Sequence, residues 1–155
     1  MQQLRAHTFR RLRKNTNIMK LFILADGACW GNPGHAAIGA VVKDQHGTIL
    51  TTISEYIGSG TNNQAEYKAL IAGLKAALAL KATEVHITID SELVERQLNG
   101  RYAVKNALLR PLFLETLKHL KRFHSYTITH ATHDENHEAH TLAQTALKAF
   151  IKEQG

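Results

Sequence analysis

The sequence predicts a single α/β domain built on a mixed five-stranded sheet, in which three antiparallel strands come first and parallel strands follow. Two observations carry this prediction. Short apolar or alternating runs separated by turn residues come first, and stretches with helical periodicity then alternate with further strands. The chain is also 155 residues long, which suits one domain with its own core. The expected element order is βββαβααβα, with helices flanking the sheet.

Three consecutive strands are expected in the first part of the chain. The apolar run LFILADG (21–27) predicts a buried strand that ends near Asp26, and AAIGAVVKD (36–44) predicts a second strand. The segment TILTTISEYIG (48–58) alternates apolar and polar residues, as a half-buried strand does. Short connections rich in turn residues join the three runs, so the strands should pair antiparallel.

A long helix is expected over residues 62–80. Three leucines recur at four-residue spacing along one face of this segment, namely Leu70, Leu74 and Leu78. Thr61 is followed three residues later by Gln64, which fits a capping box. The helix should therefore begin directly after Thr61.

The remaining elements alternate between strands and helices. Strands are expected over 84–90 and 125–130. The predicted helices cover 91–98, 107–123, with Pro111 in its first turn, and 137–152. Strands separated by helices should run parallel through right-handed crossovers.

The excess positive charge lies at the N-terminus. The net charge is +6, and residues 1–20 carry six of the 19 basic residues and none of the 13 acidic ones. This asymmetry predicts a basic N-terminal extension, 1–19, before a domain, 20–153, in which the charges after Lys20 balance. The extension could bind phosphates, or it could be a solvated or artefactual segment, since Met19 is itself a plausible translation start.

Composition excludes several classes of protein. Hydrophobic residues make up 44% of the chain, as in soluble globular proteins, and the run LFILA is too short for a membrane span or a secretory signal. The single cysteine, Cys29, excludes an internal disulfide framework and a multi-cysteine zinc site. A cytoplasmic monomer without membrane contact is expected.

Three acids occupy positions that suit a metal site. Asp26 is near the end of the first strand, Glu66 is in the first turns of the long helix, and Asp90 ends the fourth strand. Sites in open α/β sheets gather beyond the carboxyl ends of parallel strands. Converging carboxylates repel one another unless cations such as Mg²⁺ neutralise them. Two such ions can activate a water and stabilise the leaving oxygen in phosphodiester cleavage.

Each acid also has an ordinary structural interpretation. Asp26 could be a turn residue, Asp90 a helix cap and Glu66 a solvated helix acid. The neighbouring segments favour a nucleic-acid site, because Asn62 and Asn63 offer adjacent amides that can contact base edges and ribose 2′-hydroxyls. These asparagines could cap the helix as well.

The chain resembles the type 1 ribonucleases H. The matching segments occur in the family's order and spacing over about residues 20–150, namely DGACWGNPG (26–34), TNNQAE (61–66), DSELVERQLNG (90–100) and HATHDENHEAHTLA (130–143). Segment 90–106 resembles the branch that lacks a long basic protrusion. The resemblance implies a ribonuclease H-like fold and a Mg²⁺-dependent endonuclease that hydrolyses the RNA strand of RNA–DNA hybrids with two metal ions.

The resemblance also implies roles for individual residues. Three of the four acidic metal ligands of the family are matched by Asp26, Glu66 and Asp90. Positions that contact the hybrid near the cut are matched by Gly27, Cys29, Asn32, Asn62 and Asn63. Thr61 matches a residue that anchors a phosphate of the DNA strand, and His130 matches a mobile-loop histidine linked to proton transfer or product release. Glu92 stands where some members carry a glutamine on the RNA, which leaves that contact open.

His140 departs from the family pattern, because it occupies the position of the fourth acidic ligand. Three carboxylates leave two Mg²⁺ ions short of negative charge, so the second ion should bind less tightly until substrate phosphate arrives. A neutral imidazole can offer one lone pair or orient a metal-bound water, and it suits borderline metals better than Mg²⁺. We therefore expect an active enzyme, with His140 as a catalytic or metal-binding residue and with unusually good support from Mn²⁺.

Other functions stay open at this point. Histidines are dense between His119 and His140, but no cysteine cluster or HExxH pattern accompanies them to indicate zinc. A catalytically weakened hybrid- or RNA-binding module is the main alternative, and the three intact acids argue against it. A DNA nuclease of the same broad fold is another, and the paired asparagines favour RNA over it. The sequence leaves cleavage of double-stranded RNA open.

Overall fold

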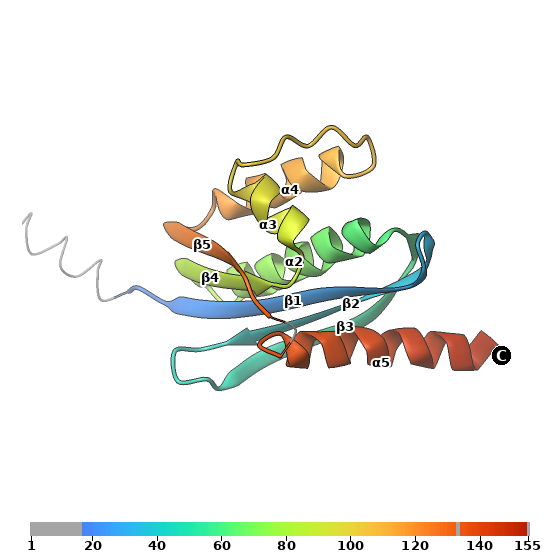
Figure 1. Ribbon diagram of the computed structural model, residues 1–155. Coiled ribbons are helices and arrows are strands. Elements are labelled where there is room, and N and C mark those ends of the chain that lie inside the picture. Colours follow the sequence, from blue (N-terminus) through green and yellow to red (C-terminus); the bar gives the residue numbers. More distant parts are fainter. Residues whose placement is uncertain (1–16, 133, 155) are drawn as a thin grey trace, which may run out of the picture.

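A mixed five-stranded sheet with helices on both faces is the framework of the protein, as described for residues 17–132 and 134–154 of the computed structural model (Figure 1). The strand order is β3-β2-β1-β4-β5. The strands are β1 (Lys20–Gly31), β2 (Gly34–Lys43), β3 (Ile49–Gly60), β4 (Glu84–Ile89) and β5 (Ser125–His130). β1, β2 and β3 pair antiparallel, whereas β4 is parallel to β1 and β5 is parallel to β4. The predicted fold class and sheet arrangement are confirmed.

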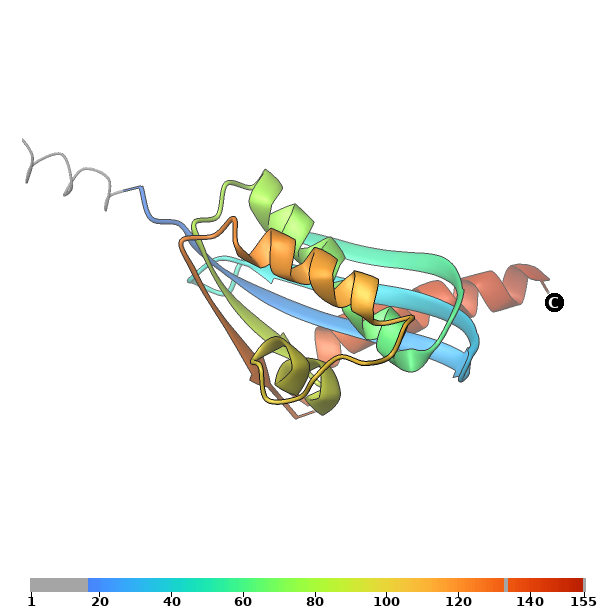
Figure 2. The same ribbon diagram turned by 90° about the horizontal axis from the view of Figure 1, so that it is seen from above.

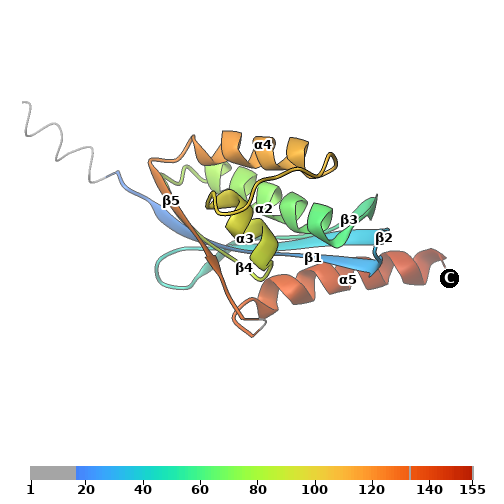
Figure 3. The same cartoon turned by 45° about the horizontal axis from the view of Figure 1, so that its top comes forward.

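Helices cover both faces of the sheet (Figure 3). One face carries α2 (Asn62–Ala79), α3 (Glu92–Leu98) and α4 (Arg110–Leu120), and α4 lies along α2 when the molecule is seen from above (Figure 2). The other face carries α5 (His137–Gln154), which packs against β1, β2 and β3. Among the described residues, no helix is long and apolar enough to cross a membrane.

The alternation of β1 divides the interior into two cores. Leu21, Ile23 and Ala25 are fully buried in the larger core, which lies under α2. Ala28 points to the opposite face and packs in a smaller cluster with residues of α5, including Leu147. Asp26 is on this second face, so β1 presents its acid toward α5.

The predicted end of the first strand was wrong. β1 continues past Asp26 to Gly31, because pairing with β2 extends through Gly31↔Gly34. The parallel pairing with β4 ends at Ala25↔Ile89, so Asp26 still follows the last parallel pair and Asp90 follows the end of β4.

The helix predicted over 107–123 is the shorter α4. Its N-terminal side is taken up by a turn in which the Asn106 side chain accepts hydrogen bonds from the backbone N–H groups of Leu108 (2.8 Å) and Leu109 (3.2 Å). Pro111 lies in the first turn of the helix, as predicted. Of the predicted basic extension, residues 1–16 lie outside the described residues, so its proposed contact with phosphates stays a prediction.

Candidate active site

Three carboxylates meet where β1 and β4 stop pairing. Asp26, Glu66 and Asp90 each offer an oxygen, and these atoms lie within 4.8 Å of one another. Asp26 and Glu66 are buried, and Asp90 is half-buried. Adjacent parallel strands bring the two aspartates together, and the first turns of α2 supply the glutamate.

The Glu66 carboxylate is in an environment that disfavours its negative charge. Its Oε1 atom accepts a hydrogen bond from the Gly27 N–H at 2.6 Å, while Oε2 is buried with no hydrogen-bond partner among the described residues. Burial and the nearby carboxylates of Asp26 and Asp90 raise the pKa of Glu66 well above its ordinary value, and the Gly27 bond opposes this shift only in part. A cation would give the orphaned oxygen a partner.

Gly27 allows β1 to approach α2 closely. A Cβ atom at this position would lie 2.6 Å from the Ala65 Cβ and 2.7 Å from the Glu66 backbone nitrogen, which is closer than packing allows. The absence of a side chain therefore places the Gly27 N–H directly against the Glu66 carboxylate.

A capping box fixes the start of α2, as predicted. The Thr61 hydroxyl accepts from the Gln64 N–H at 3.1 Å, and Gln64 Oε1 accepts from the Thr61 N–H at 2.9 Å. Because Glu66 lies in the next turn, this cap helps to set the position of its carboxylate.

His140 contacts one of the three acids directly. Its Nδ1 atom lies 2.8 Å from Asp26 Oδ2, and its side chain is about one-third exposed (32%). Within the described part of the chain, the atoms that share the 4.8 Å cluster come from the three acids and not from His140. The imidazole is therefore placed beside the carboxylate cluster, as a neighbour of Asp26.

Asn136 positions this histidine, and the sequence did not single it out. Its side chain is fully buried, and Nδ2 donates to the Ala25 carbonyl at 2.8 Å. The backbone carbonyl of Asn136 accepts a hydrogen bond from the His140 N–H at 3.1 Å. Asn136 thus ties the start of α5 to β1 next to Asp26. Its only signal in the sequence is an asparagine just before a predicted helix.

His130 lies at the end of β5, close to the same site. The ring is exposed, and Nε2 is 3.2 Å from the backbone oxygen of Asp90. The Glu92 carboxylate forms an ion pair with Arg96 one turn further along α3, at 3.0 Å.

The predicted hybrid contacts lie on the last part of β1, in the β1–β2 turn and at the start of α2. The Asn32 side chain, in the β1–β2 turn, accepts from the Asn62 N–H at 2.9 Å. Asn62 is exposed and Asn63 half-buried at the start of α2. The Cys29 thiol donates to the Gly60 carbonyl at 3.2 Å, and burial raises its pKa. These contacts join the β1–β2 and β3–α2 connections into one surface.

The donor set fits hard divalent cations. Carboxylate oxygens are the ligands that Mg²⁺ and Mn²⁺ prefer, and one buried oxygen lacks a protein partner. Fold and site together define an α/β protein with a candidate divalent-cation centre at the end of its parallel strands.

Known proteins resemble this chain in sequence and in fold. A family model described as "Reverse transcriptase-like" matches residues 24–146. Ribonuclease H of Campylobacter concisus is 35% identical over 141 residues, covering 84% of this chain and 95% of that protein. The solved structure of LC11-RNase H1 in complex with an RNA/DNA hybrid is 34% identical, with a TM-score of 0.79 over 84% of this chain and 99% of that one. The chain belongs to the ribonuclease H-like family.

The chain covers only part of some relatives. Bifunctional protein Rv2228c of Mycobacterium tuberculosis is 41% identical over 132 residues, which span 84% of this chain but 36% of that protein. The shared region is therefore about a third of the longer relative.

Proposed function

We propose that this protein is an endonuclease that hydrolyses the RNA strand of RNA–DNA hybrids, with divalent cations held by Asp26, Glu66 and Asp90. The observation that carries this proposal is the buried three-carboxylate cluster with its unpartnered Glu66 oxygen. Membership in a family whose relatives are named ribonuclease H supports it, as does the hybrid bound in a similar structure.

The cluster supplies the electrostatics that such a reaction needs. Bound cations would contribute Lewis acidity at the scissile phosphate and lower the pKa of a nearby water. The protein holds its acids rigidly, because Asp26 is on a central strand, Asp90 follows its neighbour, and Glu66 is fixed through the Gly27 hydrogen bond. Such preorganisation avoids reorganisation of the acids during the reaction.

His140 is proposed to act through Asp26. A carboxylate accepts hydrogen bonds, so in this contact Nδ1 is the donor. The imidazole then orients the Asp26 carboxylate at the edge of the centre. With three carboxylates, the centre would bind two Mg²⁺ ions less tightly than a four-acid centre, and Mn²⁺ would substitute well.

The hybrid would bind across the surface made by the β1–β2 and β3–α2 connections. We propose that it contacts the residues matched by family position, which are Gly27, Cys29, Asn32, Thr61, Asn62 and Asn63. Asparagine amides suit the ribose 2′-hydroxyls that distinguish RNA from DNA. His130, beside the backbone of Asp90, would assist proton transfer or product release.

The organisation of the chain follows the same proposal. Residues 20–153 would form the ribonuclease domain of the branch that lacks a basic protrusion, acting as a cytoplasmic monomer. The basic extension, 1–19, would add phosphate contacts. A chain that starts at Met19 should then show weaker hybrid binding and a shallower salt dependence, and an unchanged salt slope would remove this role.

Asp26→Asn separates this function from its main alternative, a hybrid-binding module that has lost catalysis. The amide keeps the size of the side chain and removes one charge at the centre. We expect the variant to lose cleavage of a labelled hybrid while hybrid affinity is retained. A wild-type protein that binds hybrid in Mn²⁺ and never cuts it would instead support the binding module.

A further inference from the structure

An exposed tryptophan stands at the far end of β1, on the face that packs against α5. The Trp30 side chain is 58% exposed, and it is the only tryptophan in the chain. Two residues earlier, Ala28 on the same face is buried against α5. A large aromatic ring on this face is therefore open to solvent.

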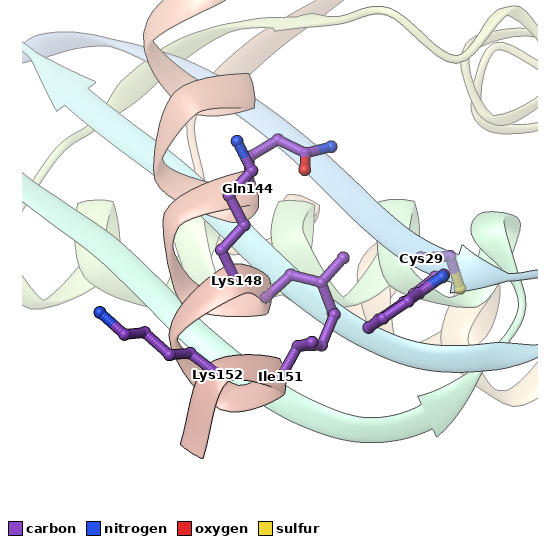
Figure 4. Close-up of a pocket in the computed structure, with 7 residues that line it drawn as sticks. Cys29, Gln144, Lys148, Ile151 and Lys152 are labelled. Atoms are coloured by element: carbon purple, nitrogen blue, oxygen red, sulfur yellow. The ribbon is translucent and has the colours of Figure 1, made fainter. Parts of the chain in front are cut away.

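A hollow of about 420 Å³ lies between Trp30 and the C-terminal half of α5 (Figure 4). Cys29 lines it from β1, while Lys148, Ile151 and Lys152 line it from successive turns of the helix. The lining therefore combines apolar side chains with two lysines, of which Lys152 points away from Cys29 in Figure 4.

A second hollow, of about 240 Å³, also includes Trp30 in its lining. It is formed with His35, Phe150 and Ile151. Phe150 stacks on Tyr56 with ring centroids 3.6 Å apart, and Tyr56 shares a 2.9 Å hydrogen bond with His35. The indole thus borders two hollows, one of which is also lined by the rings of His35 and Phe150.

The charges around the two hollows have one sign. Of the described residues that line them, Lys148 and Lys152 are cationic and none is acidic. Flat rings beside lysines are how proteins bind single-stranded nucleic acids, because bases stack on the rings and phosphates pair with the cations.

This surface lies on the same strand and the same helix as the candidate active site. Trp30 follows Asp26 by four residues of strand, which is about 13 Å at 3.3 Å per residue. Lys148 follows His140 by eight residues of helix, which is about 12 Å. Cys29, one of the proposed hybrid contacts, also lines the larger hollow.

We propose that the surface formed by Trp30, Lys148, Lys152 and Phe150 binds an unpaired segment of nucleic acid that extends from the hybrid. The proposal rests on the proposed function for the identity of the substrate. Bases of the single strand stack on the Trp30 indole, and the two lysines neutralise its phosphates. The protein therefore prefers hybrids that carry a single-stranded extension over blunt ones.

Tryptophan emission provides a direct test, since Trp30 is the only source of it. We expect an unlabelled oligothymidylate to quench the emission of the full chain, and the quench to weaken with salt. Lys148→Ala with Lys152→Ala should make the log–log salt slope shallower by about 1.4, at about 0.7 per phosphate contact on a single strand. Lys121→Ala, an exposed lysine on α4's C-terminal cap, is the matched control and should not change the slope.

Hybrid binding gives the second readout. Trp30→Ala should weaken binding of a hybrid with a single-stranded extension at least about fivefold and leave blunt-hybrid affinity unchanged. Tyr126→Ala, another exposed aromatic, should change neither. Extensions at each of the four strand ends identify the strand that reaches the surface.

Two results would overturn the proposal. One is emission that no oligonucleotide changes at low salt, which would exclude nucleic acid as the occupant of this surface. The other is an equal effect of Trp30→Ala on blunt and extended hybrids. Quenching by oligonucleotide in a protein that cuts no hybrid would support the Trp30 surface while contradicting only the proposed activity.

Discussion

The Nδ1 atom of His140 lies 2.8 Å from the Oδ2 atom of Asp26, which joins α5 directly to the carboxylate centre on β1. The resemblance to type 1 ribonucleases H leads us to expect an acid at this position, and here an imidazole contacts Asp26 instead. This contact makes the charge of the centre the first property to test.

His140→Asp would add a fourth carboxylate next to Asp26. We expect tighter Mg²⁺ binding, measured by calorimetry, and faster hybrid cleavage in Mg²⁺, because the added charge attracts the second ion. The metal-free variant should be less stable than wild type, since two carboxylates would then face each other without a cation. The wild type should work better in Mn²⁺ than in Mg²⁺, and equal or faster turnover in Mg²⁺ across a full titration would contradict this expectation.

Glu66→Gln tests whether repulsion among the three carboxylates destabilises the metal-free protein. The amide keeps the acceptor for the Gly27 N–H and gives the orphaned position a donor toward its acidic neighbours. In EDTA, the free energy of unfolding should rise by about 1 kcal/mol, which is a melting temperature higher by about 2–4 °C. Stabilisation by added Mg²⁺ or Mn²⁺ should disappear.

Glu55→Gln is the matched control, because Glu55 is exposed on β3. It should leave both the melting temperature in EDTA and the response to divalent cations unchanged. A Glu66→Gln protein that melts below wild type in EDTA would show that Glu66 is stabilising without a cation.

Much of the fold could be predicted because its elements follow local rules. Alternating apolar residues identified the strands, and Thr61 with Gln64 identified the start of α2. The end of β1 could not be found in this way, because its last residues are held by pairing with β2 and not by a local pattern. The start of α4 was missed for a local reason, because the Asn106 side chain accepts a hydrogen bond from the Leu108 N–H and forms a turn where the apolar pattern indicated helix.

Some features of the site could likewise be predicted from the sequence, and others depend on tertiary contacts. The three acids could be brought together from topology alone, since Asp26 and Asp90 follow neighbouring strands. The roles of Asn136 and Gly27 could not, because each depends on a contact between segments distant in sequence. Likewise, the position of His140 could be predicted, whereas its contact with Asp26 depends on how α5 packs against β1.

Gly27→Ala should damage both stability and catalysis. The new methyl group would collide with Ala65 and push the first turn of α2, with Glu66, away from β1. We expect a loss of about 1–3 kcal/mol in the free energy of unfolding and, from misplacement of the acid, about 100-fold slower cleavage.

Gly47→Ala is the control for Gly27→Ala, because it introduces backbone strain without a steric clash. Gly47 has a φ of +82°, and a Cβ atom at this position would have open space around it. The substitution should cost about 1 kcal/mol through its backbone alone and leave the cleavage rate unchanged. Similar cleavage rates for the two alanine variants would contradict the role assigned to Gly27.

Thr61→Ala tests the link between the cap of α2 and the hybrid. Loss of the hydroxyl removes the hydrogen bond from the Gln64 N–H and should cost about 1 kcal/mol of stability. Thr61→Ser keeps the hydroxyl and should retain both stability and hybrid affinity. If Thr61→Ala lowers stability without weakening hybrid binding, the residue is a cap and the proposed phosphate contact is wrong.

Tyr67 should make the protein sensitive to alkaline pH. Its buried hydroxyl donates to Gln97 at 2.7 Å, and burial raises the pKa of Tyr67 above its ordinary value. The unfolded chain therefore loses this proton first, so the stabilisation is complete below pH about 10 and is lost as pH rises toward the folded-state pKa. Urea unfolding should show this decline in wild type. Tyr67→Phe should lack that part of it, after an initial loss of about 1 kcal/mol at neutral pH.

Tyr126→Phe is the control, because Tyr126 is exposed on β5. It should keep the wild-type decline above about pH 10. An identical decline in Tyr67→Phe would assign the alkaline sensitivity to another group.

The most direct test of the carboxylate-centred nuclease is a cleavage assay on three labelled duplexes, in Mg²⁺ and in Mn²⁺, with Asp26→Asn alongside. We expect the wild type to cut the RNA strand of an RNA–DNA hybrid and to leave a DNA duplex intact, and we expect Asp26→Asn to cut neither. The RNA duplex shows whether the substrate range extends further. A wild-type protein that leaves the hybrid uncut in both metals, or an Asp26→Asn variant that cuts it at the wild-type rate, would contradict the proposed function.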